Sequence, residues 1–389
     1  MNNRNEEITP ESMRSHREST LKTARRIVIK VGSAVLTDAE GLNLRVVNRL
    51  ADQIASLHDK GREIVLVSSG AVAAGRKMIP FPTGEKCLPV KQAFSAVGQS
   101  RLMHVYDEAF ERYKAITAQV LLTRDDLRSR ERFLNARNTF ASLLSWRVIP
   151  IVNENDTVAV QELKFGDNDA LAVQLLNLVE ADLFVNLTSA GGVFDDNPQI
   201  NPDARPMAYI PDIGERDLAT MCRGKTLEGT GGMYSKLLSA RRAAQLGVPT
   251  LILSGLVPFS LEQGFAGEEI GTWIMPEPKA ISRRKFWLAY NLDPAGEVRI
   301  DAGAAAALHR GKSLLPAGIR SVEGSFGVGA LVRITDTDGA VLGVGLTNYR
   351  AADLKRIMGR KSSEIEAVLG RCLYTEAVHR DNMLLDAAV

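Results

Sequence analysis

The sequence predicts an α/β fold with an open, mostly parallel sheet sandwiched by helices, followed by a small C-terminal β-rich domain. In the first part, short apolar runs rich in β-branched residues alternate with longer stretches of helical periodicity. The connections between them are short, which is typical of parallel strands joined by helices. After residue 284 the pattern changes to short strands separated by glycine-containing turns.

The predicted elements of the first part follow one another in a regular order. Expected strands cover 26–33, 63–67, 116–122, 148–152, 183–187 and 250–253, and expected helices cover 44–60, 89–113, 128–144, 169–180 and 237–246. Gly61 and Gly247 follow two of these helices at the position where a left-handed residue ends a helix. We expect domains at 23–275 and 285–375, with a disordered polar leader (1–22), a linker (276–284) and a C-terminal tail (376–389).

Composition is that of an ordinary soluble globular protein. Hydrophobic residues make up 45% of the 389 positions, charged residues 24%, and the formal net charge is +2. Cys87, Cys222 and Cys372 are far apart, which argues against a zinc site or a disulfide framework and favours a reducing compartment. No apolar run reaches the roughly 18 residues of a membrane helix, and the N-terminus lacks a signal segment. We therefore expect a cytoplasmic protein without a membrane partner.

Two lysines lie beside glycine-containing turns. Lys30 lies near the end of the first strand, two residues before Gly32, and Lys236 ends the glycine-rich segment 229–236 that opens a helix. Backbone amides and an ammonium group at such turns suit a phosphate, as does the small-residue turn 68–75 before another helix. The alternatives are lysines that extend to solvent and small residues that permit close packing. The glycine spacings of a Walker A loop and of a dinucleotide-binding motif are both missing.

An acidic, amide-rich segment follows the fourth strand. It contains Glu154, Asn155, Asp156, Asp167, Asn168 and Asp169. The first polar residues beyond a buried strand lie at the carboxyl edge of the sheet, where these groups would bind a ligand's ammonium group or orient lysines. The alternative is a pair of polar turns, in which Asp167 or Asn168 is a helix cap. Lys30 precedes this segment in the sequence and Lys236 follows it. Together with these lysines, the segment favours phosphoryl transfer, in which the protein positions the reactants and supplies cations rather than forming a covalent intermediate.

Seven segments, in this order, resemble the glutamate 5-kinase family of the amino-acid kinase superfamily. They are KVGSAVLT (30–37), SSGAVAAG (68–75), LLTRDD (121–126), FLNARNT (133–139), NENDTV (153–158), GDND (166–169) and GTGGMYSK (229–236). The resemblance extends from Arg25 to about Gly370 and identifies 23–275 as the amino-acid kinase domain.

The resemblance implies that ATP phosphorylates the side-chain carboxylate of L-glutamate, which is the first step of proline biosynthesis. Lys30 and Lys236 are then the catalytic lysines at the transferred phosphoryl group, and Asp169 orients them. The residues implied to bind glutamate are Ser69, Gly70, Ala71, Asp156, Asn168 and Asp167. The residues implied to bind the nucleotide are Lys30, Thr188, Ser189, Thr230, Gly231, Gly232, Met233, Tyr234, Ser235 and Lys236.

The substrate and the metal follow from the same resemblance. Asp156 suits a free α-amino group, so the acidic segment favours glutamate over acetylglutamate, which has no ammonium to pair. Ser189 stands where an aspartate is common in the family, and this weakens the nucleotide assignment at that position. Mg²⁺ is expected with ATP and would be bound mostly through phosphate oxygens, because the sequence shows no dedicated ligand set.

The C-terminal part resembles the PUA domain appended to many glutamate 5-kinases, through residues 313–319, 322–327 and 348–349. PUA domains elsewhere bind RNA, but residues 281–389 carry only a small excess of basic side chains, so a structural or regulatory role is favoured. The competing interpretation is an RNA-binding regulator with a vestigial kinase half, against which the intact Lys30, Asp169 and Lys236 argue. The family further implies inhibition by proline, a homo-oligomer and functional coupling to glutamate-5-semialdehyde dehydrogenase.

Overall fold

The computed structural model describes residues 9–79, 87–159, 167–198, 200–214, 232–278, 280–291, 293–371 and 374–385. The chain divides into two compact units, residues 1–280 and 281–389, and the predicted linker, 276–284, spans their boundary. Among the described helices, none has the length and apolar character needed to cross a membrane.

The first unit is built on an eight-stranded sheet with the order β10-β12-β11-β7-β1-β4-β6-β5. Its strands are β1 (Arg26–Val31), β4 (Glu63–Ser68), β5 (Thr117–Leu122), β6 (Ile149–Glu154), β7 (Leu183–Thr188), β10 (Tyr209–Ile210), β11 (Thr250–Ser254) and β12 (Thr272–Ile274). All neighbouring strands pair in parallel except β12, which runs antiparallel to β11. This arrangement confirms the predicted open, mostly parallel sheet. Two short hairpins flank it, β2 (Thr37–Asp38) with β3 (Gly41–Leu42) and β8 (Val193–Phe194) with β9 (Pro206–Met207).

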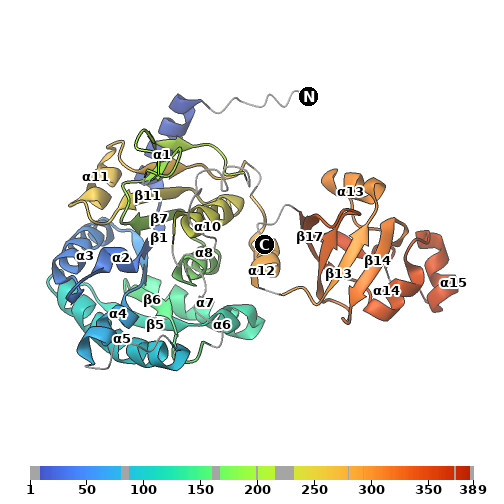
Figure 1. The fold of residues 1–389 in the computed structure, drawn as a ribbon, viewed down its shortest axis with the longest axis horizontal. Coiled ribbons are helices and arrows are strands. Elements are labelled where there is room, and N and C mark those ends of the chain that lie inside the picture. The colour runs from blue at the N-terminus through green and yellow to red at the C-terminus, as the bar shows by residue number, and fades with distance from the viewer. Residues whose placement is uncertain are drawn as a thin grey trace. The chain divides into compact units, whose positions relative to one another are not determined.

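Helices cover both faces of the sheet, with α2 and α3 on one side of the central strands and α8 and α10 on the other (Figure 1). Their bounds are α2 (Ser33–Leu36), α3 (Leu44–Asp59), α4 (Ala71–Met78), α5 (Leu88–Glu111), α6 (Arg124–Arg128), α7 (Arg130–Ser145), α8 (Asp167–Val179), α10 (Met233–Gln245) and α11 (Ser260–Ala266). Successive strand residues point to opposite faces. Ile27 and Ile29 of β1 therefore join the core beneath α3 and α5, while Lys30 faces α8.

The polar N-terminal segment is not a disordered leader over its described part. Residues Pro10–Thr23 form helix α1, which begins with a capping box at Thr9. Met13, Arg17 and Leu21, spaced by four residues, are buried, and the Arg17 guanidinium donates to two backbone carbonyls of segment 268–270 at 2.7 and 2.9 Å. The prediction was wrong for residues 10–22 because one buried stripe suffices to dock a polar helix. Residues 1–8 lie outside the described part of the chain.

The second unit is a five-stranded sheet with the order β14-β13-β15-β16-β17. Its elements are α12 (Arg283–Asn291), β13 (Gly296–Ile300), α13 (Ala302–His309), β14 (Ile319–Gly324), β15 (Leu331–Thr335), β16 (Val341–Thr347), α14 (Ala351–Ile357), α15 (Ile365–Leu369) and β17 (Val378–Leu385), with 3-10 turns at Pro316–Gly318 and Ser362–Glu364. The predicted tail, 376–389, contains β17, which pairs with β16 and buries Val378 and Met383. The predicted domain end at 375 is therefore too early.

Helices α4 and α5 touch through their backbones. A Cβ on Gly98 would lie 1.7 Å from the backbone oxygen of Ala71, and a Cβ on Gly75 would lie 1.8 Å from that of Phe94. Only glycine fits at such a crossing, because a backbone oxygen cannot move aside as a flexible side chain can. The crossing fixes the start of α4, just beyond β4, against the middle of α5.

We expect Gly98→Ala to lower the free energy of unfolding by about 3 kcal/mol, because the added methyl group forces the two helices apart. Urea unfolding followed by circular dichroism measures this change. Gly191→Ala is the matched control: a Cβ at Gly191 meets nothing within 4 Å, so its effect should stay below about 0.5 kcal/mol. Equal stability of the two variants would show that the crossing is not tight.

Candidate active site

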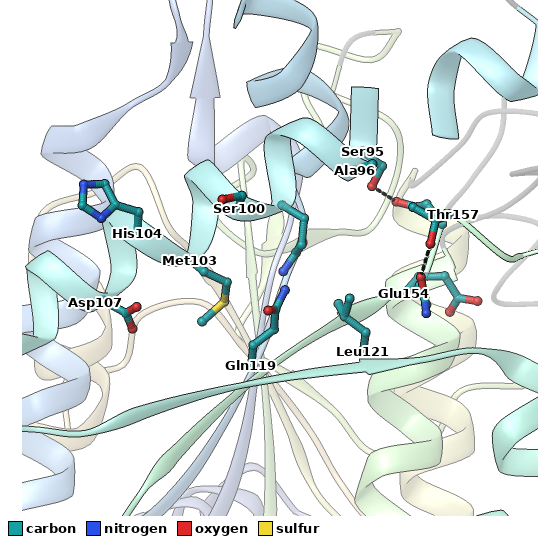
Figure 2. A pocket seen from close by; sticks show the side chains of 13 residues that line it. Ser95, Ala96, Ser100, Met103, His104, Asp107, Gln119, Leu121, Glu154 and Thr157 are labelled. Atoms are coloured by element: carbon teal, nitrogen blue, oxygen red, sulfur yellow. Dashed lines mark hydrogen bonds between the residues drawn. The ribbon is translucent and has the colours of Figure 1, made fainter. Parts of the chain in front are cut away.

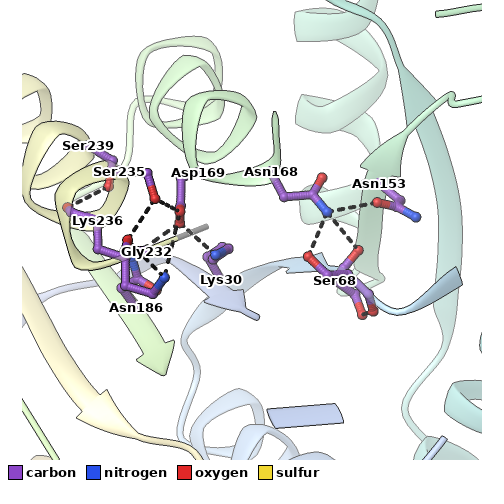
Figure 3. A network of polar contacts seen from close by, with 11 residues as sticks. Lys30, Ser68, Asn153, Asn168, Asp169, Asn186, Gly232, Ser235, Lys236 and Ser239 are labelled. Carbon is purple, nitrogen blue, oxygen red and sulfur yellow. Dashed lines mark hydrogen bonds and ion pairs between the residues drawn. The ribbon is translucent and has the colours of Figure 1, made fainter. Parts of the chain in front are cut away.

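Parallel pairing brings the ends of several strands to one edge of the sheet, and helix α8 begins above that edge. Lys30 of β1 lies in register with Val67 of β4 and with Asn186 of β7. Asn168 and Asp169 are consecutive residues in the first turn of α8. Because consecutive helical residues point about 100° apart, these two side chains reach different parts of the edge. Figure 3 shows the two resulting clusters.

The first cluster surrounds Asp169, whose carboxylate is 2% exposed. Lys30 Nζ lies 2.6 Å from Asp169 Oδ1, and Lys236 Nζ lies 3.9 Å from Oδ2. The hydroxyl of Ser235, next to Lys236 at the start of α10, lies 2.8 Å from Asp169 Oδ2 and also 2.8 Å from the carbonyl of Gly232. Lysines from two distant segments thus share one buried carboxylate. The structure brings together the three residues predicted to be catalytic.

The second cluster surrounds the Asn168 side chain. Its Nδ2 donates to Ser69 Oγ at 2.7 Å and to Asn153 Oδ1 at 3.0 Å, and it lies 3.5 Å from the Ser68 carbonyl. Asn153 Nδ2 in turn donates to Gln99 Oε1 at 2.9 Å. The ends of β4 and β6 are therefore tied to the start of α8 by neutral amide and hydroxyl groups.

The turn after β4 has the shape of an anion site. Gly70, at φ 109°, adopts a left-handed conformation that L side chains rarely accept, and it directly precedes Ala71, the first residue of α4. The first backbone amides of a helix have no partner within it, so they are available to a carboxylate. Below the turn, the buried Ser68 hydroxyl and the Tyr106 hydroxyl lie 2.9 Å apart, and burial raises the pKa of Tyr106.

Asp156 is buried at the end of the β6 loop, and Ser95 Oγ donates to its Oδ2 at 2.5 Å. Burial raises the pKa of this carboxyl, although the hydrogen bond from Ser95 opposes the shift. Ser95 and Gln99 are one turn apart on α5, so a single helix face holds both Asp156 and Asn153. Among the described residues, Asp156 and Asn168 are not joined by a direct hydrogen bond: Asp156 is held by Ser95, and Asn168 by Ser69 and Asn153.

The predicted nucleotide-binding residues are only partly described. Thr188 ends β7 as a buried residue and Ser189 after it is exposed; Gly232, Met233 and Ser235 are half-buried, Tyr234 is 37% exposed, and Lys236 is buried. Gly232 is the N-cap of α10. Thr230 and Gly231 lie outside the described residues, as does the side chain of Asp167.

Sequence reasoning did not assign Ser95, Gln99, Asn153 or Asn186 to the site. Asn153 could have been found, because it is the first polar residue after an apolar strand. Ser95 and Gln99 lie within a long helix, and Asn186 lies within an apolar strand. A single polar residue inside such an element does not by itself predict a binding or catalytic role. Their roles depend on which elements become neighbours.

A cavity of about 540 Å³ lies beside this site, between α5 and strands β5 and β6. Figure 2 shows Ser100, Met103 and His104 on the helix, opposite Gln119 and Leu121 on β5. Ser95, Gln99, Glu154 and Asp156 also line it, whereas the lysines and Asp169 do not. The cavity therefore touches the Asp156 side of the site and not the cluster around Asp169.

We expect Asp169→Asn to destabilise the fold by about 3–5 kcal/mol, because Lys30 loses the one carboxylate that the described residues offer it. Thermal unfolding measures this change. The double variant Lys30→Met with Asp169→Asn should recover part of the loss, since it removes the closer of the two buried ammonium groups and leaves that of Lys236. Unchanged stability of Asp169→Asn would mean that the buried pair contributes nothing to the fold.

Comparisons with known proteins agree with this architecture. The amino acid kinase family matches residues 25–254, and the PUA domain matches residues 296–369. A protein of Oleidesulfovibrio alaskensis named glutamate 5-kinase is 64% identical over 375 residues, covering 96% of this chain and 99% of its own length. Proteins of the same name from Maridesulfovibrio salexigens and Geobacter sulfurreducens are 63% and 49% identical, covering 96% and 95% of this chain and the whole of their own. The chain therefore belongs to the amino acid kinase family, among relatives named glutamate 5-kinase, and carries a PUA domain after its kinase domain.

Proposed function

We propose that this protein transfers the γ-phosphoryl group of ATP to the side-chain carboxylate of L-glutamate, giving L-glutamyl 5-phosphate for proline biosynthesis. The observation that carries the proposal is the arrangement of Lys30 and Lys236 around Asp169, beside the amide cluster of Asn168. The names of the near full-length relatives support the same reaction.

In the reaction, an oxygen of the glutamate side-chain carboxylate forms a bond to the γ-phosphorus of ATP. The bond from that phosphorus to the bridging oxygen breaks, and ADP leaves. Charge spreads over the transferred oxygens, so fixed cations stabilise the transition state. Lys30 and Lys236 supply these cations, and Asp169 fixes where both ammonium groups lie.

Glutamate is bound on the side of the edge formed by β4, β6 and α4. The backbone amides at Gly70 and Ala71, together with the side chains of Ser69 and Asn168, suit a carboxylate. Asp156 suits the α-ammonium group, and a bound ammonium would stabilise its charged form against burial. Asp167 is proposed for the same site from the resemblance alone.

The nucleotide phosphates are proposed to lie at the start of α10 and at the end of β7, where Gly232, Ser235 and Thr188 are found. ATP use follows from the family. Both oxygens of Asp169 already contact cations or donors, and the described residues contain no cluster of three metal-ligating side chains. These residues do not form a magnesium cage by themselves, so no step is assigned to the metal.

Four further properties are proposed from the resemblance. They are inhibition by proline, assembly into a homo-oligomer, functional coupling to glutamate-5-semialdehyde dehydrogenase and location in the cytoplasm. RNA binding by the PUA domain is not proposed, because the small charge excess of residues 281–389 does not favour it.

The test is ADP release by the purified protein with Mg-ATP, with hydroxylamine present to trap an acyl phosphate. L-glutamate should give hydroxamate and N-acetyl-L-glutamate should not. Activity with the acetylated acid alone would keep the fold and overturn the substrate. Turnover of neither acid, together with retention of structured RNA on a filter, would favour an RNA-binding regulator.

We expect Lys236→Ala to lower kcat by at least about a hundredfold while the fold survives, because its ammonium group acts on charge that develops in the transition state. Steady-state kinetics with both substrates measures this effect. Lys91→Ala, a lysine on α5 outside the Asp169 cluster, is the control and should keep wild-type rates. Near-normal turnover of Lys236→Ala would remove this residue from catalysis.

Asp156→Asn should raise the KM for glutamate about tenfold or more, since a charged hydrogen bond to the ammonium group is lost, with little change in kcat.

In the wild type, burial raises the pKa of Asp156, so the KM for glutamate should rise as the pH falls toward the ordinary aspartate pKa from above. In the pH range just above that ordinary pKa, the folded protein binds a proton that the unfolded chain has lost, so the stability linked to Asp156 falls as the pH rises. The variant should lose both dependences. An unchanged KM would place Asp156 outside the site.

A further inference from the structure

Strand β7 carries one polar side chain in the middle of an apolar run. Its sequence is Leu-Phe-Val-Asn-Leu-Thr, and Asn186 is 0% exposed. In the sheet, Asn186 lies between Lys30 of β1 and Ile252 of β11. Residues in register on parallel strands point to the same face, so Asn186 and Lys30 lie side by side under Asp169, as Figure 3 shows.

Among the described residues, the amide of Asn186 has one hydrogen-bond partner where it could have several. Its Nδ2 lies 3.5 Å from Asp169 Oδ1, the oxygen that also pairs with Lys30. Its buried Oδ1 has no hydrogen-bond partner among the described residues. A leucine of similar size would avoid the free-energy cost of this unpaired oxygen. The presence of an amide at this position therefore calls for a reason other than stability.

We infer that Asn186 is a positioning residue for Asp169, and through it for the lysines that act on the phosphoryl group. Asp169 Oδ1 contacts Lys30 and Asn186, while Oδ2 faces Ser235 and Lys236. Each oxygen thus has one lysine and one neutral donor. The neutral donors resist rotation of the carboxylate about its χ2 angle, so each lysine keeps its own oxygen when the phosphates arrive. This inference rests on the proposed function.

The first variant is Asn186→Leu, which removes the donor and the unpaired oxygen together. We expect kcat to fall about fivefold, as for the loss of one ordinary hydrogen bond, while the KM values for ATP and glutamate stay within about twofold. The Tm should be equal to or higher than that of the wild type. A lower kcat in a protein of undiminished stability is a combination that a merely structural role does not produce.

Thr250→Val is the matched control. Thr250 is also buried in the same sheet, and its side-chain oxygen has no partner in the part of the chain that the structure describes, but it lies at the opposite end of β11 from the candidate site. This variant should raise the Tm and leave kcat unchanged. Equal losses of kcat in both variants would overturn the role of Asn186, because the losses would then reflect sheet packing in general.

The second variant is Asn186→Asp, which keeps the size of the side chain in case leucine is not accommodated. Its ionised form places a like charge beside Asp169 and should lower kcat more than leucine does. Its protonated form donates again, so the ratio of its kcat to that of the wild type should rise as the pH is lowered. A pH-independent ratio, or wild-type kcat in Asn186→Leu, would overturn the positioning role. Absence of glutamate turnover by the wild type would instead refute the proposed function.

Discussion

The candidate site depends on one buried carboxylate that two lysines share. Lys30 comes from the first strand of the sheet and Lys236 from helix α10, near the end of the kinase domain, and Asp169 from α8 lies between them. Ammonium groups this deeply buried are costly unless they are paired. The pairing is available only when α8 and α10 pack on the same face of the sheet, over the first strand. The cluster therefore exists only when these parts of the α/β domain are packed together.

The other half of the site depends on a close approach of two helices. Gly75 and Gly98 let α4 touch α5, and this contact sets the turn at Ser69 against the helix that carries Ser95 and Gln99. Those two side chains hold Asp156 and Asn153. The backbone contact of α4 with α5, together with the hydrogen bonds of Asn168 to Ser69 and Asn153, thus sets the distance between the turn proposed to bind a carboxylate and the Asp156 carboxylate proposed for the ammonium group.

Much of the fold and the central residues of the site could be predicted from the sequence. The strand from Arg26 and the strand from Leu183 are apolar runs with clear ends, and Lys30 and Lys236 lie within a few residues of glycine in patterns that suit phosphate. Helix α1 and strand β17 were missed, because each is largely polar and is stabilised by a few buried contacts with distant segments. Gln99 and Asn186 carry no local signal, since their roles arise only when α5 meets β6 and β1 meets β7.

The start of α8 joins the two halves. Asn168 binds the turn proposed for the phosphoryl acceptor, and the next residue, Asp169, binds the lysines proposed for the donor phosphates. A rotation of the first turn of α8 would move both side chains together, because the helical backbone fixes the angle between them. The proposed acceptor site and the two lysines proposed to be catalytic therefore share one rigid reference, the first turn of α8. Such a reference suits phosphoryl transfer, in which catalysis comes mostly from the relative placement of acceptor, phosphorus and cations.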